Sequence, residues 1–203
     1  RLMELAARVL EPNSPRLGPT ETEEDVDAIF AELEAEIEND ENPTFREQGI
    51  DALKKELESL RGMRQNLHGS YTEITDEKEV IRVSAREPRC VVHFYHGNFR
   101  RCEIMDKHLA KLASQYFQTR FFRVFVENVP WLVERLAIKV LPCVICFVNG
   151  ISQDRLIGFE ELGNTDTFTT AALEQRLLSS GKSWRHFIDQ TLMYYQVSYR
   201  KQL

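Results

Sequence analysis

The residues of this sequence that could do chemistry lie in two short stretches, and each stretch contains cysteine. Cys102 stands at the start of a predicted helix, directly after a strand-like run that ends at Tyr95. A thiol at a helix N-terminus has a lowered pKa, and the neighbouring Arg100 and Arg101 would lower it further. Cys102 could thus be a reactive thiol, but disulfide exchange needs a second thiol to release the mixed disulfide, so we favour a structural or occasional redox role over catalysis.

The second stretch contains a CxxC motif formed by Cys143 and Cys146. We predict a strand here, and residues three apart on a strand point to opposite faces. A zinc site would also need a second pair of ligands, which this sequence does not offer. We therefore interpret both as core cysteines. His93 and His96 have no carboxylate or thiol partner nearby in sequence, so we predict no metal site and interpret His93 as a core histidine.

Three consecutive elements must position Cys102. The run from Cys90 to Tyr95 is short and mostly apolar, as in a strand that is covered on both faces. The stretch 96–98 interrupts it. From 103 to 117, apolar residues recur with the 3.6-residue period of a helix, namely Met105, Leu109, Leu112 and Tyr116.

The flanking sequence predicts further elements of the same kind. We expect strands at 71–74, 119–126, 142–147 and 155–157, and helices at 76–86, 130–136 and 168–178. Asp76 and Glu79 form a capping pair, Pro130 suits a helix start, and Asn149-Gly150 predicts a tight hairpin. The predicted order over residues 68–181 is β-α-β-α-β-α-β-β-α, which indicates an α/β domain.

The N-terminal part has a different composition. Residues 1–20 contain a proline-rich stretch and are predicted to be a linker or disordered. Residues 21–41 hold eleven acidic residues and no basic one, yet their apolar residues recur at helical spacing. We predict an anionic amphipathic helix that binds a partner; a solvated acidic segment is the alternative. The expected contact residues are Val26, Ile29, Phe30, Leu33, Glu34, Ile37 and Glu38.

Residues 45–67 predict a second, mixed-charge helix, which either binds a partner or packs on the globular domain. Residues 21–67 thus form an N-terminal helical extension. Residues 182–203 form a tail of unknown role whose apolar residues are compatible with a helix.

Composition excludes several classes of function. The 203-residue chain has a net charge of −6, which argues against nucleic acid as a partner. No apolar run approaches the length of a membrane span, and the first residues lack a signal-peptide pattern. The four cysteines lie mostly in apolar surroundings, as reduced thiols of a cytosolic protein do.

The stretch from His93 to Glu103 resembles the active-site turn of thioredoxins, D-F-W-A-E-W-C-G-P-C-K, without a gap. Cys102 falls on the second cysteine of that turn. Phe99 replaces the first cysteine, the nucleophile, and His93 replaces the buried acid that accepts a proton. The resemblance therefore implies a framework without its attacking thiol, and so not an enzyme.

Two later stretches extend this resemblance. Val140-Leu141-Pro142 matches the cis-proline loop of thioredoxins, which implies a cis bond before Pro142, and Val148-Asn149-Gly150 matches the hairpin that follows. The implied fold is thioredoxin-like: a central mixed sheet flanked by helices, here with the N-terminal helical extension.

A thioredoxin-like domain behind an acidic helix, without the nucleophilic cysteine, resembles the phosducin-like family, and within it the thioredoxin-domain members and their fungal counterparts. The matching stretches are 91–109, 139–144 and 157–168, with 45–56 and 68–74, so the likeness spans about 22–180. It implies a non-catalytic cytoplasmic co-chaperone without a cofactor. Such a protein binds the cytosolic chaperonin (CCT/TRiC) and modulates its ATPase and the folding of actin and tubulin clients.

Two alternatives stay open. Cys102 could serve a single-cysteine redox protein that works with glutathione or an outside thiol. The chain could also regulate G-protein βγ dimers, as phosducin does, but the dedicated N-terminal binding helix of phosducin is not recognisable here.

Overall fold

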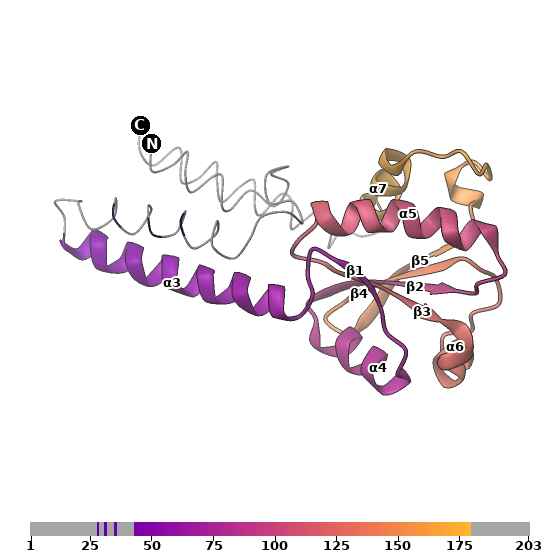
Figure 1. The fold of residues 1–203 in the computed structure, drawn as a ribbon, viewed down its shortest axis with the longest axis horizontal. Helices are drawn as coiled ribbons and strands as arrows, with labels where there is room; N and C mark the ends of the chain where they lie inside the picture. The colour runs from indigo at the N-terminus through magenta and orange to yellow at the C-terminus, as the bar shows by residue number, and fades with distance from the viewer. Residues whose placement is uncertain (1–27, 29–30, 32–34, 36–42, 180–203) are drawn as a thin grey trace. The chain divides into compact units, whose positions relative to one another are not determined.

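The computed structural model describes residues 28, 31, 35 and 43–179 (Figure 1). Positions 28, 31 and 35 are helical; the remainder of the predicted anionic helix lies outside the described residues, as do 1–20 and 182–203. The chain divides into two compact units, Arg1–Tyr71 with Ala113–Arg120 and Thr72–Leu112 with Phe121–Leu203. Within the described part of the chain, no helix combines the length and apolarity that crossing a membrane requires.

Helix α3 (Pro43–Gln65) belongs to the first unit and confirms the second predicted helix. The chain leaves α3 through Leu67 and Gly69, whose φ angles are 61° and 76°. The His68 ring donates from Nδ1 to the carbonyl oxygen of Phe117 over 2.8 Å. A Cβ at Gly69 would lie 2.9 Å from the Phe117 ring, so this turn requires glycine both for its positive φ and for space.

A five-stranded sheet is the centre of the domain, with the strand order β1-β3-β2-β4-β5. The strands are β1 (Tyr71–Glu73), β2 (Arg89–Tyr95), β3 (Arg120–Phe125), β4 (Cys143–Val148) and β5 (Ile151–Ile157). Strand β4 runs antiparallel to both β2 and β5. Helical crossovers connect β1 to β2 and β2 to β3, which is the connection that parallel strands need. The sheet is therefore mixed, as expected.

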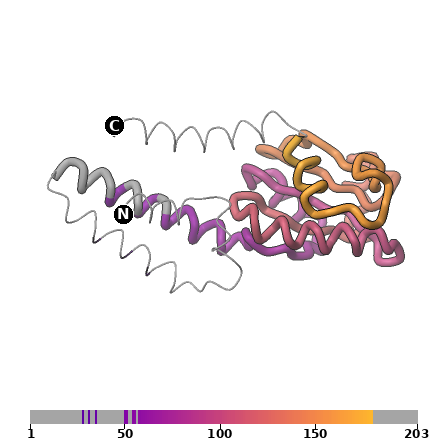
Figure 2. Tube along the Cα trace, turned by 90° about the horizontal axis from the view of Figure 1, so that it is seen from above, coloured from indigo at the N-terminus to yellow at the C-terminus, as the bar shows by residue number. Residues whose placement is uncertain are grey.

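Helices cover both faces of this sheet (Figures 1 and 2). Helices α5 (Arg100–Gln115) and α7 (Thr170–Ser179) lie on one face, and α4 (Glu77–Arg86) and α6 (Pro130–Arg135) lie on the other. Two short 3₁₀ helices, η1 (Val126–Asn128) and η2 (Glu160–Leu162), complete the order. The predicted start signals are confirmed: the Asp76 carboxylate accepts from the Glu79 N–H at 3.0 Å, and Pro130 begins α6.

Strand β2 is buried on both faces, as its apolar run predicts. Alternate residues of β2 and β4 pack with Val80 of α4 and Leu132 of α6 in one cluster; they are Cys90, Val92, Phe94, Cys143, Ile145 and Phe147. The intervening residues of β2, Val91 and His93, are also fully buried. The thioredoxin-like fold and its element order are thus as the sequence predicted.

Several element boundaries differ from the prediction; α5, for example, spans Arg100–Gln115 rather than 103–117. Two of the differences have a local reason. Strand β5 begins at Ile151 rather than at 155. Ile151 is exposed at the edge of the sheet and is followed by the polar stretch 152–154, so the start of the strand shows no apolar alternation. Helix α7 begins at Thr170 rather than at 168. The Thr169 hydroxyl accepts from the Ala172 N–H at 3.1 Å and caps the helix there.

Candidate functional site

The turn between β2 and α5 is where the sequence placed the candidate chemistry, and it is held by local hydrogen bonds. The Phe99 N–H donates to the His96 carbonyl at 3.1 Å, and the Cys102 N–H donates to the Phe99 carbonyl at 2.9 Å. The Asn98 N–H donates to Nδ1 of His96 at 3.2 Å. Within this fixed turn, the Phe99 side chain is 50% exposed, whereas Cys102 is only 1% exposed.

The expectation of a lowered pKa for Cys102 is wrong. Burial raises the pKa of the Cys102 thiol, and the carboxylates of Asp106 and Glu103 add to this; a backbone hydrogen bond at His96 opposes it less strongly. Burial destabilises the Cys102 thiolate by more free energy than the helix N-terminus stabilises it. Arg101 was expected to stabilise the Cys102 thiolate, but its guanidinium instead donates to Asp166 at 2.9 Å.

The exposed side of the turn is a small ring cluster. The His96 ring meets the Phe99 ring edge-on at 5.6 Å between centroids and lies 5.2 Å from the Phe125 ring. Nε2 of His96 lies 3.2 Å from a carboxylate oxygen of Glu127. His96 is thus held from several sides and supports the exposed phenyl ring of Phe99.

The loop before β4 lies at the same end of the sheet as this turn. Phe94 of β2 pairs with Cys143 of β4, which places the residues after β2 beside those before β4. The Leu141-Pro142 bond is cis, which confirms the expectation for Pro142. The Pro142 carbonyl accepts from the Gly158 N–H at 2.8 Å and ties the loop to the end of β5.

A chain of polar contacts runs beneath the turn and ends at His93. Nδ1 of His93 lies 2.8 Å from one oxygen of Asp106, and Arg123 donates to the other oxygen at 2.8 Å. Arg123 also donates to Glu73 at 2.9 Å, and the Tyr95 hydroxyl donates to Glu73 at 2.8 Å. The Arg123 guanidinium stacks 4.7 Å from the Tyr95 ring centroid. Side chains from β1, β2, β3 and α5 therefore meet around Arg123.

Burial outweighs these polar contacts in setting the pKa of His93. Burial lowers the pKa of His93, against the opposing effect of its bond to Asp106. Burial alone would lower the pKa of Arg123 too, but Asp106, Tyr95 and Glu73 together raise it. Burial and the bond to Glu73 raise the pKa of Tyr95 to about 12. His93 is a core histidine as predicted, and its carboxylate partner comes from α5.

Sequence reasoning missed Asp106, Arg123 and Glu73. They stand as single charges in three separate elements, so no motif connects them. The available signals were local: Arg123 interrupts the apolar strand β3, and Asp106 lies one helical turn after Cys102.

The CxxC residues are core cysteines, as predicted. Cys143 and Cys146 are free and buried on β4, and Cys143 packs in the cluster beneath α4 and α6. Burial raises the pKa of Cys143 to about 11 and raises that of Cys146 as well. Among the described residues, no three His, Cys, Asp or Glu side chains are grouped to hold a metal ion.

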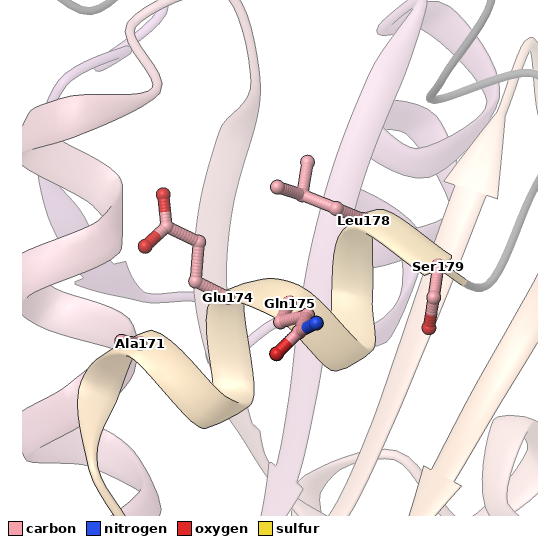
Figure 3. Close-up of a pocket in the computed structure, with 5 residues that line it drawn as sticks. All are labelled: Ala171, Glu174, Gln175, Leu178 and Ser179. Atoms are coloured by element: carbon pink, nitrogen blue, oxygen red, sulfur yellow. The ribbon is translucent and has the colours of Figure 1, made fainter.

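A surface pocket lies elsewhere, on α7 (Figure 3). Its lining residues are Ala171, Glu174, Gln175, Leu178 and Ser179. They all belong to one helix, and they include no thiol and no histidine. This pocket therefore offers no chemistry that competes with the β2–α5 turn.

The predicted partner-binding residues cannot be placed by the fold. Val26, Ile29, Phe30, Leu33, Glu34, Ile37 and Glu38 all lie outside the described residues. Their role stays a prediction.

Comparison with known proteins gives the family. No family profile matches the chain. It is 40% identical to the thioredoxin domain-containing protein plp1 of Schizosaccharomyces pombe, over 76% of this chain and 54% of that protein. It is 38% identical to the human thioredoxin domain-containing protein 9, over 78% of this chain and 70% of that protein. It is 37% identical to phosducin-like protein 3 of Drosophila melanogaster, over 71% of this chain and 67% of that protein.

The chain spans about half the length of the fission-yeast relative. Among solved structures, it is similar to spinach chloroplast thioredoxin f, with 17% identity, a TM-score of 0.49, and coverage of 62% of this chain and 93% of that one. With identities near 40% across most of two of these relatives, the chain belongs to the phosducin-like family of thioredoxin-domain proteins.

Proposed function

We propose that this protein is a non-catalytic co-chaperone that binds the cytosolic chaperonin CCT/TRiC and modulates its ATPase and its folding of actin and tubulin. The observation that supports this most is the altered turn. Phe99 occupies the exposed position, while the remaining Cys102 is buried and has a raised pKa. Regulation by binding, rather than thiol exchange, suits this arrangement.

Two features of the turn argue against redox catalysis. The attacking species in disulfide exchange is an accessible thiolate, and a second thiol must release the mixed disulfide. Cys102 is inaccessible, and Phe99 cannot supply the other sulfur. His93 would have to accept a buried charge to act as a base, and burial holds its pKa low.

The chaperonin as partner rests on family membership and on the composition of residues 21–41. An apolar stripe on a strongly anionic segment suits a helix that docks in a groove. Phe30, Leu33 and Ile37 would supply most of the affinity, and Glu34 and Glu38 would set encounter rate and register. Binding to a chaperonin of the cytosol would require the protein to be cytoplasmic.

The docking proposal is tested with purified chaperonin and the full chain. We expect binding and a changed ATPase rate, and at least a tenfold weaker affinity for Phe30→Ala/Leu33→Ala. The charge variant Glu34→Gln/Glu38→Gln should mainly slow association and reduce its salt dependence. Purified G-protein βγ serves as the competing partner. Binding to βγ without binding to the chaperonin would overturn the proposal.

The non-catalytic part is tested by insulin-disulfide reduction. Wild type and Cys102→Ser should show equal, negligible rates. Phe99→Cys restores a second thiol three residues before Cys102 and serves as the sensitivity control, because it should reduce insulin faster than either. A rate in the wild type that disappears in Cys102→Ser would establish the single-cysteine redox alternative.

A further inference from the structure

The hairpin between β4 and β5 contains the only asparagine of this sequence that is followed by glycine, Asn149-Gly150. Glycine has no side chain, so its backbone nitrogen is the least shielded neighbour that an asparagine carboxamide can have. That nitrogen can attack Cγ of the asparagine and close a five-membered ring. The dipeptide that forms this turn is therefore also the place where attack on an asparagine meets the least steric resistance.

The structure leaves both reacting groups accessible. Asn149 and Gly150 are exposed, at the tip of a hairpin whose second strand forms an edge of the sheet. Within residues 43–179, neither the Asn149 carboxamide nor the Gly150 N–H makes a hydrogen bond. The Asn149 N–H does donate to the Pro88 carbonyl at 2.9 Å, but neither of these two groups takes part in ring closure. The described contacts therefore restrain neither the nucleophile nor the carbon that it attacks.

Asn164 is a matched case with the same backbone conformation and less reactive surroundings. Its φ angle is 52°, against 50° at Asn149, and it is exposed as well. However, Oδ1 of Asn164 accepts from Arg101 at 2.9 Å, and its N–H donates to the Phe159 carbonyl at 2.7 Å. The next residue is Thr165, whose branched side chain crowds its own nitrogen. The held carboxamide and the following residue, rather than exposure or φ, thus distinguish the two asparagines.

We propose that Asn149 is a site of spontaneous modification in the folded protein, with water as the only co-reactant. The Gly150 nitrogen bonds to Cγ of Asn149, the Cγ–Nδ2 bond breaks, and the amide group leaves as ammonia with the proton from the Gly150 N–H. Water then opens the cyclic imide. Cleavage between Cγ and the Gly150 nitrogen gives aspartate; cleavage between the main-chain carbonyl carbon of Asn149 and that nitrogen gives isoaspartate. The site depends on the β4–β5 hairpin alone and not on the chaperonin assignment.

The two products should affect the hairpin differently. An aspartate is compatible with the turn, because Asp-Gly forms the same kind of two-residue hairpin as Asn-Gly. An isoaspartate adds one carbon atom to the main chain between Val148 and Ile151, which pair directly across the turn. The tip has little room to absorb it, since even a Cβ at Gly150 would lie 3.4 Å from the backbone of Ala85 in α4. We therefore expect the isoaspartyl form to weaken the pairing at the start of β5.

The experiment incubates the full chain, folded or unfolded in urea, at mildly alkaline and at mildly acidic pH. Peptide mass spectrometry measures the conversion of amide to acid at each asparagine, and an isoaspartyl methyltransferase with labelled S-adenosylmethionine detects isoaspartate. In the folded chain, we expect conversion at Asn149 to be about tenfold faster than at Asn98 or Asn164. It should be faster at alkaline pH, because the attacking nitrogen must lose its proton. The folded rate at Asn149 should stay within about tenfold of the unfolded rate.

The matched variants are Asn149→Gly and Asn164→Gly, because glycine adopts the positive φ of both positions and Gly-Gly also forms two-residue hairpins. The first should remove most of the methyl label, and the second should leave the label unchanged. A label that persists in Asn149→Gly, or conversion at Asn149 only in the unfolded chain, would overturn the proposal.

Hydrogen exchange tests the expected effect on the hairpin. In the separated isoaspartyl form, the amide of Ile151 should exchange about tenfold faster than in Asn149→Asp, which represents the aspartyl product. Equal exchange in the two forms would show that the added main-chain carbon leaves the pairing of β4 with β5 intact, and would refute this part of the proposal.

Discussion

Two arginines in the second unit each bridge a pair of carboxylates, and they serve different regions. Arg176 of α7 binds Asp154 of β5 and Glu161 of η2. Arg123 of β3 binds Glu73 of β1 and Asp106 of α5. The first fastens a helix to the edge of the sheet. The second continues through Asp106 to the buried His93 beneath the turn.

The environments of these two arginines differ as well. The Arg176 side chain is more buried than that of Arg123. The bonds to Glu161 and Asp154 raise the pKa of Arg176 against the effect of burial. Arg123 instead shares its carboxylates with Tyr95 and His93. The comparison teaches that one type of ion pair can fasten a helix to the edge of the sheet in one region and take part in the polar contacts of a buried histidine in the other.

The largest effect is expected at the more buried arginine. Arg176→Met leaves Asp154, itself largely buried, without its cation and should lower the free energy of unfolding by about 3 kcal/mol. Urea denaturation measures this. Arg82→Met is the control, because its pair with Glu79 is largely exposed and should contribute less than about 1 kcal/mol. Equal losses would remove the distinction between the two kinds of pair.

Asp106→Asn should cost about 2 kcal/mol, because the neutral amide leaves Arg123 with one carboxylate and weakens the bond to His93. The change should also be visible at the turn. NMR shifts of the His93 ring should move in Asp106→Asn and stay unchanged in Arg176→Met. If the His93 ring shifts move in both variants, the ring responds to the loss of either ion pair, and the contacts of Arg123 are not specifically connected to His93.

The neutral His93 should make the fold sensitive to acid. The folded state keeps the pKa of His93 below 6.5, so below that pH the unfolded chain binds the proton first. Stability should be complete above about pH 6.5 and fall below it by up to about 1.4 kcal/mol per pH unit.

His93→Leu should flatten this slope when urea midpoints are measured between pH 7 and 5 (about one pH unit on either side of 6). His108, whose pKa burial also lowers, contributes in the same direction, so His108→Asn should flatten the slope as well and measures that contribution separately. An unchanged slope in His93→Leu would show that this histidine does not titrate on unfolding.

The smallest effect is expected at the exposed end of the polar chain. Glu73→Gln should cost about 0.5 to 1 kcal/mol, since Glu73 is partly exposed. It should also lower the pKa of Tyr95 from about 12 while leaving it above 10, because burial is the larger cause of the shift. Absorbance titration against Tyr95→Phe isolates this tyrosine from the other five.

The sequence predicted most of the framework because its signals are local. The apolar run of β2, the Asn149-Gly150 hairpin with φ angles of 50° and 79°, and the cap at Asp76 each act within a few residues. The polar chain could not be predicted, since Glu73 and Arg123 meet from positions 50 residues apart. The pKa of Cys102 was mispredicted for a related reason: the helix terminus is visible in the sequence, but the burial that outweighs it depends on tertiary packing.

The burial of the cysteines has a practical consequence. All four native cysteines are free and buried, and the most exposed of them shows only 1% of its surface. A single cysteine introduced on the surface would therefore be the fast-reacting position under native conditions. Probes for distance measurement or crosslinking can be attached there while the native thiols are retained.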